Sequence, residues 1–137
     1  MSGPSPDLVA RPLAGRTLSA RDDPTFVLEE LIDDGSSPGY PLAPLHRHLD
    51  EDEAWYVLEG RLVVRVGEDE HSIGPGEAVL GPKRVAHTFW NPDAAPVRYL
   101  LVTGPRTARL LASIDRLPSE RAAVEALFRH HGIELLG

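Results

Sequence analysis

Short apolar runs separated by glycine and proline dominate most of this chain. Between residues 16 and 103, stretches rich in Val, Leu and Ile alternate with turn-forming residues, a spacing typical of many short strands. Many short strands without helical breaks favour a sandwich or a small barrel, which buries one face of each strand. The pattern therefore predicts an all-β domain over residues 16–103.

Two of the apolar runs lie on either side of Gly60. Apolar residues alternate with arginines at period two over residues 61–66, as expected for a strand with one buried face. We interpret residues 54–67 as a half-buried hairpin that turns at Gly60. Another apolar run, residues 26–32, is expected at a sheet edge, where unpaired backbone groups invite pairing with another chain.

The pattern changes to helical spacing after Gly104. Two segments, residues 105–117 and 118–132, each begin with proline and repeat apolar residues at helical intervals. We predict two short helices in a C-terminal extension over residues 104–137, with Gly132 ending the second helix.

The first 15 residues contain three prolines and two glycines, which resist regular structure unless another surface orders them. We expect residues 1–15 to form a flexible N-terminal arm that crosses to the partner subunit of a homodimer.

Composition narrows the classes of partner. The 137 residues carry 14 Lys and Arg against 21 Asp and Glu, a net charge of −7, so a nucleic acid backbone would be repelled. No apolar stretch approaches the roughly 20 residues that cross a membrane, and the N-terminal sequence has no secretion signal. We therefore expect a cytoplasmic protein. Because there is no cysteine, any metal must be held by His and carboxylate groups.

One group of residues has the chemistry of such a site. His46 and His48 are two positions apart, so both imidazoles point to the same face of a strand. Glu53 begins the next apolar run, and His87 lies on a later one. Three imidazoles and a carboxylate that converge from separate strands form a site for a divalent metal, with positions left for water or substrate.

The glycine and proline frame around these residues resembles the two conserved motifs of the cupin superfamily. Residues 39–60 match the first motif, which runs from a glycine through His-x-His and Glu to a second glycine. Residues 76–91 match the second motif at every fixed position except Arg84, where the family usually has glycine. That arginine either adopts a positive φ, at about 1–2 kcal/mol, or belongs to a differently built turn.

The resemblance implies a double-stranded β-helix, the jelly-roll barrel of cupins. It also implies that His46, His48, Glu53 and His87 bind one divalent transition metal ion, which could be Fe, Mn, Ni, Co or Zn. Glu53 would be the fourth ligand or, when it leaves the metal, a catalytic general base.

Several aromatic and apolar residues are candidates for a substrate pocket. Trp55 and Val57 share the strand face of Glu53, and Phe89 shares that of His87. They either line a mostly apolar cavity or simply pack in the core. One of the three tyrosines, Tyr40, Tyr56 or Tyr99, is a candidate for a pocket hydroxyl.

The other histidines have simpler interpretations. His71 fits no ligand position and is expected at the surface or at the rim of the barrel. His130 and His131 end the second helix, where the helix dipole favours positive charge, so a capping role is expected.

A metal ion beside an apolar wall can stabilise a phenol, enol or diketone oxygen as its anion. The leading hypothesis is a metal-dependent enzyme acting on such a small molecule, with a dioxygenase reaction as the first option, by resemblance to small quercetin dioxygenase-like and polyketide cyclase-like cupins. A non-redox cyclase, isomerase or lyase is the alternative. A non-catalytic binding module also remains open, because fold alone does not choose between them.

Overall fold

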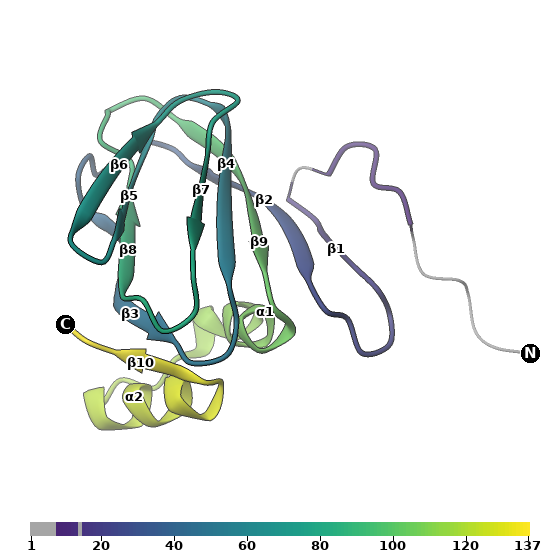
Figure 1. Cartoon of the computed structure of the whole chain (residues 1–137), viewed down its shortest axis with the longest axis vertical. Coiled ribbons are helices and arrows are strands. Elements are labelled where there is room, and N and C mark those ends of the chain that lie inside the picture. Colours follow the sequence, from purple (N-terminus) through teal and green to yellow (C-terminus); the bar gives the residue numbers. More distant parts are fainter. Residues whose placement is uncertain (1–7, 14) are drawn as a thin grey trace, which may run out of the picture.

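The structure, a computed structural model, describes residues 8–13 and 15–137. Within these residues, ten strands form two five-stranded antiparallel sheets (Figure 1), with the orders β1-β2-β9-β4-β7 and β10-β3-β8-β5-β6. The strands are β1 (Thr17–Ser19), β2 (Val27–Asp33), β3 (Pro41–His48), β4 (Glu53–Glu59), β5 (Leu62–Val66), β6 (Asp69–Ile73), β7 (Ala78–Gly81), β8 (His87–Trp90), β9 (Val97–Thr103) and β10 (Ile133–Leu135).

From β2 to β5, each strand crosses to the sheet opposite the one before it. Alternating residues of the two sheets pack against each other in a common core, because period-two strands place every second side chain inward. Its fully buried members come from both sheets and include Trp55, Val57, Leu62, Val64 and Val97. This arrangement confirms the expected all-β jelly-roll barrel.

The interpretation of residues 54–67 as one hairpin is wrong. Strand β4 pairs with β7 and β9 in the first sheet, whereas β5 pairs with β6 and β8 in the second. Gly60, at φ 79°, turns the chain from one sheet to the other, and a Cβ there would lie 2.5 Å from the Pro96 carbonyl oxygen. Period-two alternation is the same in a hairpin and in a crossover, so the pattern does not distinguish them. Strand β5 instead forms a hairpin with the next strand, β6.

The apolar run at residues 26–32 is not at a sheet edge. Its strand, β2, lies between β1 and β9. The edge position is taken by β1, a three-residue strand too short to stand out in the hydrophobic pattern. Most of the predicted arm at residues 1–15, namely residues 1–7 and 14, lies outside the described residues.

The C-terminal segment contains the two predicted helices, α1 (Pro105–Ala112) and α2 (Arg121–His130), with a 3₁₀ turn at Ile114–Arg116 between them. Helix α1 begins at its proline, but α2 begins three residues after Pro118. Gly132 follows α2 at φ 75°, as expected for a helix end.

Strand β10 follows α2 and was not anticipated from the sequence, because three residues carry too little pattern. It pairs with β3, while Leu110 of α1, Phe128 of α2 and Ile133 of β10 form a second apolar cluster. The helices and β10 thereby lie across one end of the barrel, at the bottom of Figure 1. No helix in the described part of the chain is long and apolar enough to cross a membrane.

Candidate metal centre

The four candidate ligands come together at the end of the barrel that faces α1 and α2. His46 and His48 lie on β3, Glu53 begins β4 and His87 begins β8. All four side chains are buried, and one ligand atom from each lies within 4.8 Å of all the others. The structure therefore brings together the residues that the sequence motifs single out, in a group that could hold a metal ion.

Short distances inside this group join one carboxylate oxygen to two imidazole nitrogens. Glu53 Oε2 lies 2.7 Å from His48 Nε2 and 3.4 Å from His87 Nε2. All three atoms are nevertheless buried without an aligned hydrogen-bond partner. Buried polar atoms without partners are costly, and a cation among the three would satisfy them together. The donor set of nitrogen and carboxylate oxygen fits a divalent transition metal.

Hydrogen bonds fix the Nδ1 atoms of His46 and His48, the ring nitrogens on the side away from Glu53. His46 Nδ1 lies 2.6 Å from the Pro44 carbonyl oxygen, which can only accept, so this nitrogen carries the proton. His48 Nδ1 lies 3.0 Å from the Thr107 hydroxyl of α1. The Nε2 atom of His46 is thereby left with a free lone pair, as metal binding requires.

Burial and neighbouring groups set the protonation of the site. Burial, with the nearby His87, lowers the pKa of His46 to about 4. Burial alone would raise the pKa of the Glu53 carboxyl, but the His48 and His87 imidazoles outweigh it and lower that pKa to about 2. At neutral pH the site therefore presents a neutral His46 and an ionised Glu53, the forms that bind metals.

A cavity of about 170 Å³ opens onto this group between the barrel and the helices. Phe89 and Tyr99 line it from the barrel, and Leu110, Leu111 and Phe128 line it from the C-terminal segment. Burial raises the pKa of the Tyr99 hydroxyl, which keeps it protonated as a hydrogen-bond donor. Among the described residues that line the cavity, none is Lys or Arg.

Of the predicted pocket residues, the structure places only Phe89 on the cavity wall. Trp55 and Val57 are fully buried in the barrel core, and the Trp55 ring meets His87 at its edge, with 5.1 Å between ring centroids. Among the tyrosines, Tyr99 faces the cavity, whereas Tyr40 and Tyr56 are exposed.

Comparison with known proteins decides the family. The family model described as a cupin domain matches residues 36–103. The TT1209 protein of Thermus thermophilus is 30% identical, with a TM-score of 0.54, and the alignment covers 72% of this chain and 90% of that one. The chain belongs to the cupin superfamily.

Two other similar proteins are matched over about half of their length. A sugar phosphate isomerase from a cupin superfamily, from Silicibacter pomeroyi DSS-3, is 29% identical with a TM-score of 0.51, and the alignment covers 58% of this chain and 50% of that chain. An uncharacterized protein of Methanocaldococcus jannaschii is 26% identical over 61 residues, which are 44% of this chain and 49% of that protein. This cupin thus spans about half the length of both relatives.

The backbone conformation of Arg84 explains how this chain accommodates its departure from the second cupin motif. Arg84 adopts φ 70°, the left-handed conformation that the usual glycine would take without strain. Its backbone N–H donates to the His48 carbonyl oxygen at 2.6 Å, and its Nε donates to the Leu49 carbonyl oxygen at 3.2 Å. The turn is therefore kept, and it anchors the end of the strand that carries two candidate ligands.

The remaining histidines of this cupin lie away from the metal centre. His71 is exposed on β6, and His130 is exposed in the last turn of α2. At the end of the same helix, His131 Nδ1 lies 2.9 Å from the Leu127 carbonyl oxygen, which agrees with a capping role.

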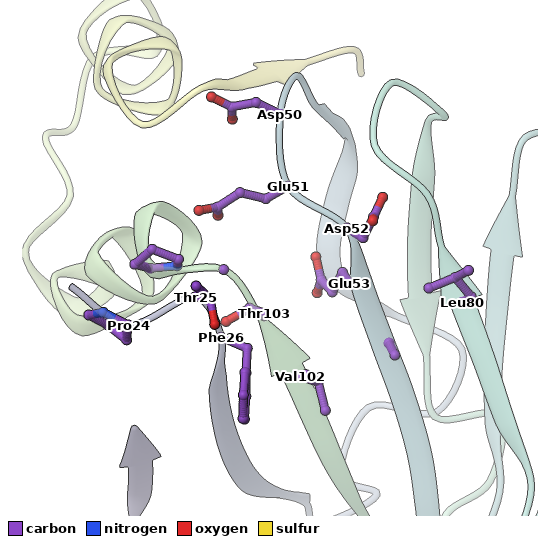
Figure 2. Close-up of a pocket in the computed structure, with 13 residues that line it drawn as sticks. Pro24, Thr25, Phe26, Asp50, Glu51, Asp52, Glu53, Leu80, Val102 and Thr103 are labelled. Atoms are coloured by element: carbon purple, nitrogen blue, oxygen red, sulfur yellow. The ribbon is translucent and has the colours of Figure 1, made fainter. Parts of the chain in front are cut away.

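A larger hollow of about 460 Å³ lies beside the loop that joins β3 and β4 (Figure 2). Its wall includes four successive acidic residues, Asp50 to Glu53. Asp50 pairs with Arg106 at 2.7 Å, Glu51 binds the first turn of α1, and Asp52 accepts the Lys83 backbone N–H at 2.8 Å. These carboxylates are already engaged by the protein.

The sequence did not single out the residues that the C-terminal segment contributes. Thr107, Leu110 and Phe128 all lie beyond the matched cupin domain. Their helical spacing was visible, but nothing in that spacing shows which end of the barrel the helices cover.

Proposed function

We propose that this cupin is a metal-dependent enzyme that acts on a small, uncharged, oxygenated organic compound such as a phenol, enol or diketone. The observation that supports this most directly is the composition of the cavity at the metal centre. Its wall is mostly apolar, and its described lining residues include no Lys or Arg to neutralise a phosphate.

The cavity volume sets the size of the substrate. An engineered apolar cavity of about 150 Å³ binds benzene, so a cavity of about 170 Å³ accommodates one aromatic ring or its equivalent. Phe89 offers a ring for stacking or edge contact, and the protonated Tyr99 hydroxyl can donate to a substrate oxygen.

A divalent ion bound by His46, His48, Glu53 and His87 would supply a Lewis acid that stabilises negative charge on the substrate oxygen. Glu53 stays ionised because its pKa is low, so it serves as a ligand at neutral pH. The apolar side chains of α1 and α2 exclude water from the bound substrate.

Two reactions fit this site. A dioxygenase is the first, because the ligand set leaves coordination positions open. A non-redox isomerase or cyclase is the second, and the 29% identical relative described as a sugar phosphate isomerase favours it. The absence of cationic side chains among the described residues of the cavity wall argues against a phosphorylated substrate for this chain.

The test begins with elemental analysis of protein purified without added metal, followed by turnover assays with phenols and diketones in the presence and absence of oxygen. We expect turnover with an uncharged compound, and its loss under anaerobic conditions identifies the dioxygenase. Turnover that continues without oxygen identifies the isomerase or cyclase. Binding without turnover would overturn the enzyme proposal in favour of a binding module.

Matched histidine variants test the site itself. His46→Ala and His87→Ala are expected to lose most of the bound metal while the barrel still folds, because the core consists of other residues. His71→Ala, on the exposed face of β6, is expected to retain it. Full metal retention in both site variants would contradict the ligand assignment.

A further inference from the structure

We propose that Thr107 and Glu51 are positioning residues that hold His48 in the tautomer that metal binding requires. The inference rests on the proposed metal centre and adds to it a part of the chain beyond the matched cupin domain. Thr107 is a buried residue of α1, 59 positions from His48, so helix docking brings the two together.

The hydrogen bonds around the Thr107 hydroxyl determine where its proton lies. Its Oγ1 is 2.8 Å from Glu51 Oε1 and 3.0 Å from His48 Nδ1. An ionised carboxylate only accepts, so the single hydroxyl proton goes to Glu51. The Thr107 oxygen must then accept from His48 Nδ1–H, which leaves the lone pair of His48 on Nε2. That atom lies 2.7 Å from Glu53 Oε2, inside the ligand group.

Glu51 is itself fixed by the first turn of α1. Its Oε1 accepts the Thr107 backbone N–H at 2.9 Å, and its Oε2 accepts the Arg106 backbone N–H at 2.9 Å. Figure 2 shows the Glu51 side chain pointing toward this turn. A carboxylate at a helix N-terminus is favoured by both the free N–H groups and the helix dipole. Glu51 therefore replaces the missing side-chain cap at Gly104.

Gly104 leaves the space that the Glu51 carboxylate occupies. A Cβ at this position would overlap the carboxylate of Glu51. The backbone of Gly104, with φ −83° and ψ 170°, suits any residue, so it is this close approach that favours glycine. A substitution here would displace Glu51 and, through it, Thr107.

A hydrogen-bond partner of this kind on a ligating histidine typically changes metal affinity by about 10- to 100-fold. Of the three histidines, His46 uses a backbone carbonyl, and His87 Nδ1 has no partner among the described residues. Only for His48 is the partner of Nδ1 a side chain in the described structure, and that side chain, Thr107, can be changed by mutation.

The test compares three threonine variants. Thr107→Val keeps the shape of the side chain but removes the hydroxyl, and Thr107→Ser keeps the hydroxyl. Thr103→Val is the matched control, because Thr103 is equally buried and its Oγ1 has no hydrogen-bond partner in the described structure. Each is titrated with Co²⁺, whose visible absorption reports the ligand set, in competition with a chelator.

We expect Thr107→Val to weaken Co²⁺ binding by about 10- to 100-fold, with near wild-type affinity for Thr107→Ser and Thr103→Val. Gly104→Ala is expected to weaken binding in the same direction as Thr107→Val. Unchanged affinity in Thr107→Val, or an equal loss in Thr103→Val, would overturn the positioning role. Failure of the wild-type chain to bind Co²⁺ would overturn the metal centre as well.

A metal-free measurement gives an independent readout. Nitrogen chemical shifts of His48 in the apo protein distinguish its two neutral tautomers. A proton on Nδ1 is expected in the wild type and in Thr107→Ser, whether or not Nε2 also carries one toward Glu53, and partial loss of the Nδ1 proton is expected in Thr107→Val. The Nε2–H tautomer in the wild type would overturn the proposal.

Discussion

At the scale of single residues, Arg84 shows how a departure from a family pattern is accommodated. It holds a positive φ that glycine adopts freely, and an L-residue there is strained by about 1–2 kcal/mol. The backbone N–H of Arg84 keeps its bond to the His48 carbonyl. The strain is thus local, and the ligand-bearing strand is held as a glycine would hold it.

Comparison of Arg84→Gly with Arg84→Ala measures this strain. Both variants lose the side-chain bond to Leu49, so their difference reflects the backbone. We expect the glycine variant to be more stable by about 1 kcal/mol in urea unfolding, because relief of strain exceeds the greater freedom of glycine in the unfolded chain. Lys83 does not have a positive φ. Lys83→Ala should therefore be more stable than Lys83→Gly. Equal stability of the two Arg84 variants would contradict the strain.

The pH dependence of the metal-free protein tests the burial of His46. Its pKa falls from the ordinary 6.5 to about 4, so between these values the unfolded chain binds the proton more tightly. The contribution of the neutral His46 to the free energy of unfolding is therefore fully present above pH 6.5. It is lost as the pH falls toward 4, by an amount on the order of 3 kcal/mol.

Urea midpoints measured from about pH 7.5 to 4 check this expectation. His46→Asn should show a shallower loss of stability over the window, whereas His71→Asn should keep the wild-type slope because His71 is exposed. A wild-type slope in His46→Asn would show that another group titrates instead.

At the scale of elements, the C-terminal segment completes both a sheet and a cavity. Strand β10 extends the second sheet beside β3, and α1 and α2 supply one wall of the cavity. The second apolar cluster, Leu110, Phe128 and Ile133, is separate from the barrel core. Two clusters of different size indicate two levels of local stability.

Phe128→Ala tests whether the segment opens on its own. Truncation of a buried phenylalanine lowers the free energy of unfolding by about 3–5 kcal/mol. The loss destabilises the smaller cluster, to which Phe128 belongs. We expect faster amide hydrogen exchange in β10 and at the β3 residues paired with it, while β4 and β9 stay protected. Leu136→Ala, at a partly exposed position, serves as the control. Uniformly faster exchange throughout the barrel would show a single cooperative unit.

The same elements show how far sequence reasoning reaches. The spacing of glycines and histidines identified the four clustered residues, because short-range geometry places His46 and His48 on one face and the motif turns bring Glu53 and His87 to them. Sheet membership was not predictable, since a crossover and a hairpin share one periodicity. Thr107 was not predictable either, because its role depends on how α1 docks 59 positions away from His48.

At the scale of the whole molecule, part of the outer face of the first sheet is apolar. Strand registers align one residue from each strand in a row across it, Leu18, Leu28, Val102, Ala54 and Leu80. Leu80 is 60% exposed, and nearby Phe26 and Tyr56 are 60% and 41% exposed. Extended apolar faces of this kind mark interaction surfaces.

We expect this face to form the interface of a homodimer, because a two-fold axis pairs the same apolar patch on both subunits. Light scattering at micromolar concentration should give the mass of a dimer. Leu80→Glu should give a monomer, and Tyr40→Ser, at an exposed residue of the other sheet region, should leave the dimer intact. A monomeric wild-type protein would reject the interface. Deletion of residues 1–15 tests separately whether the arm contributes.

The pairing of β10 with β3 also has a consequence for biosynthesis. Arg47 and Glu134, which form an ion pair across these strands at 2.7 Å, are 87 positions apart. At about 5–20 residues per second, translation of the intervening chain takes roughly 4–17 seconds. During that interval β3 has no β10 beside it, and Pro41 and Pro44 within β3 limit mispairing because proline offers no N–H. The strand that carries His46 and His48 therefore acquires its last neighbour only after β10 has been synthesised.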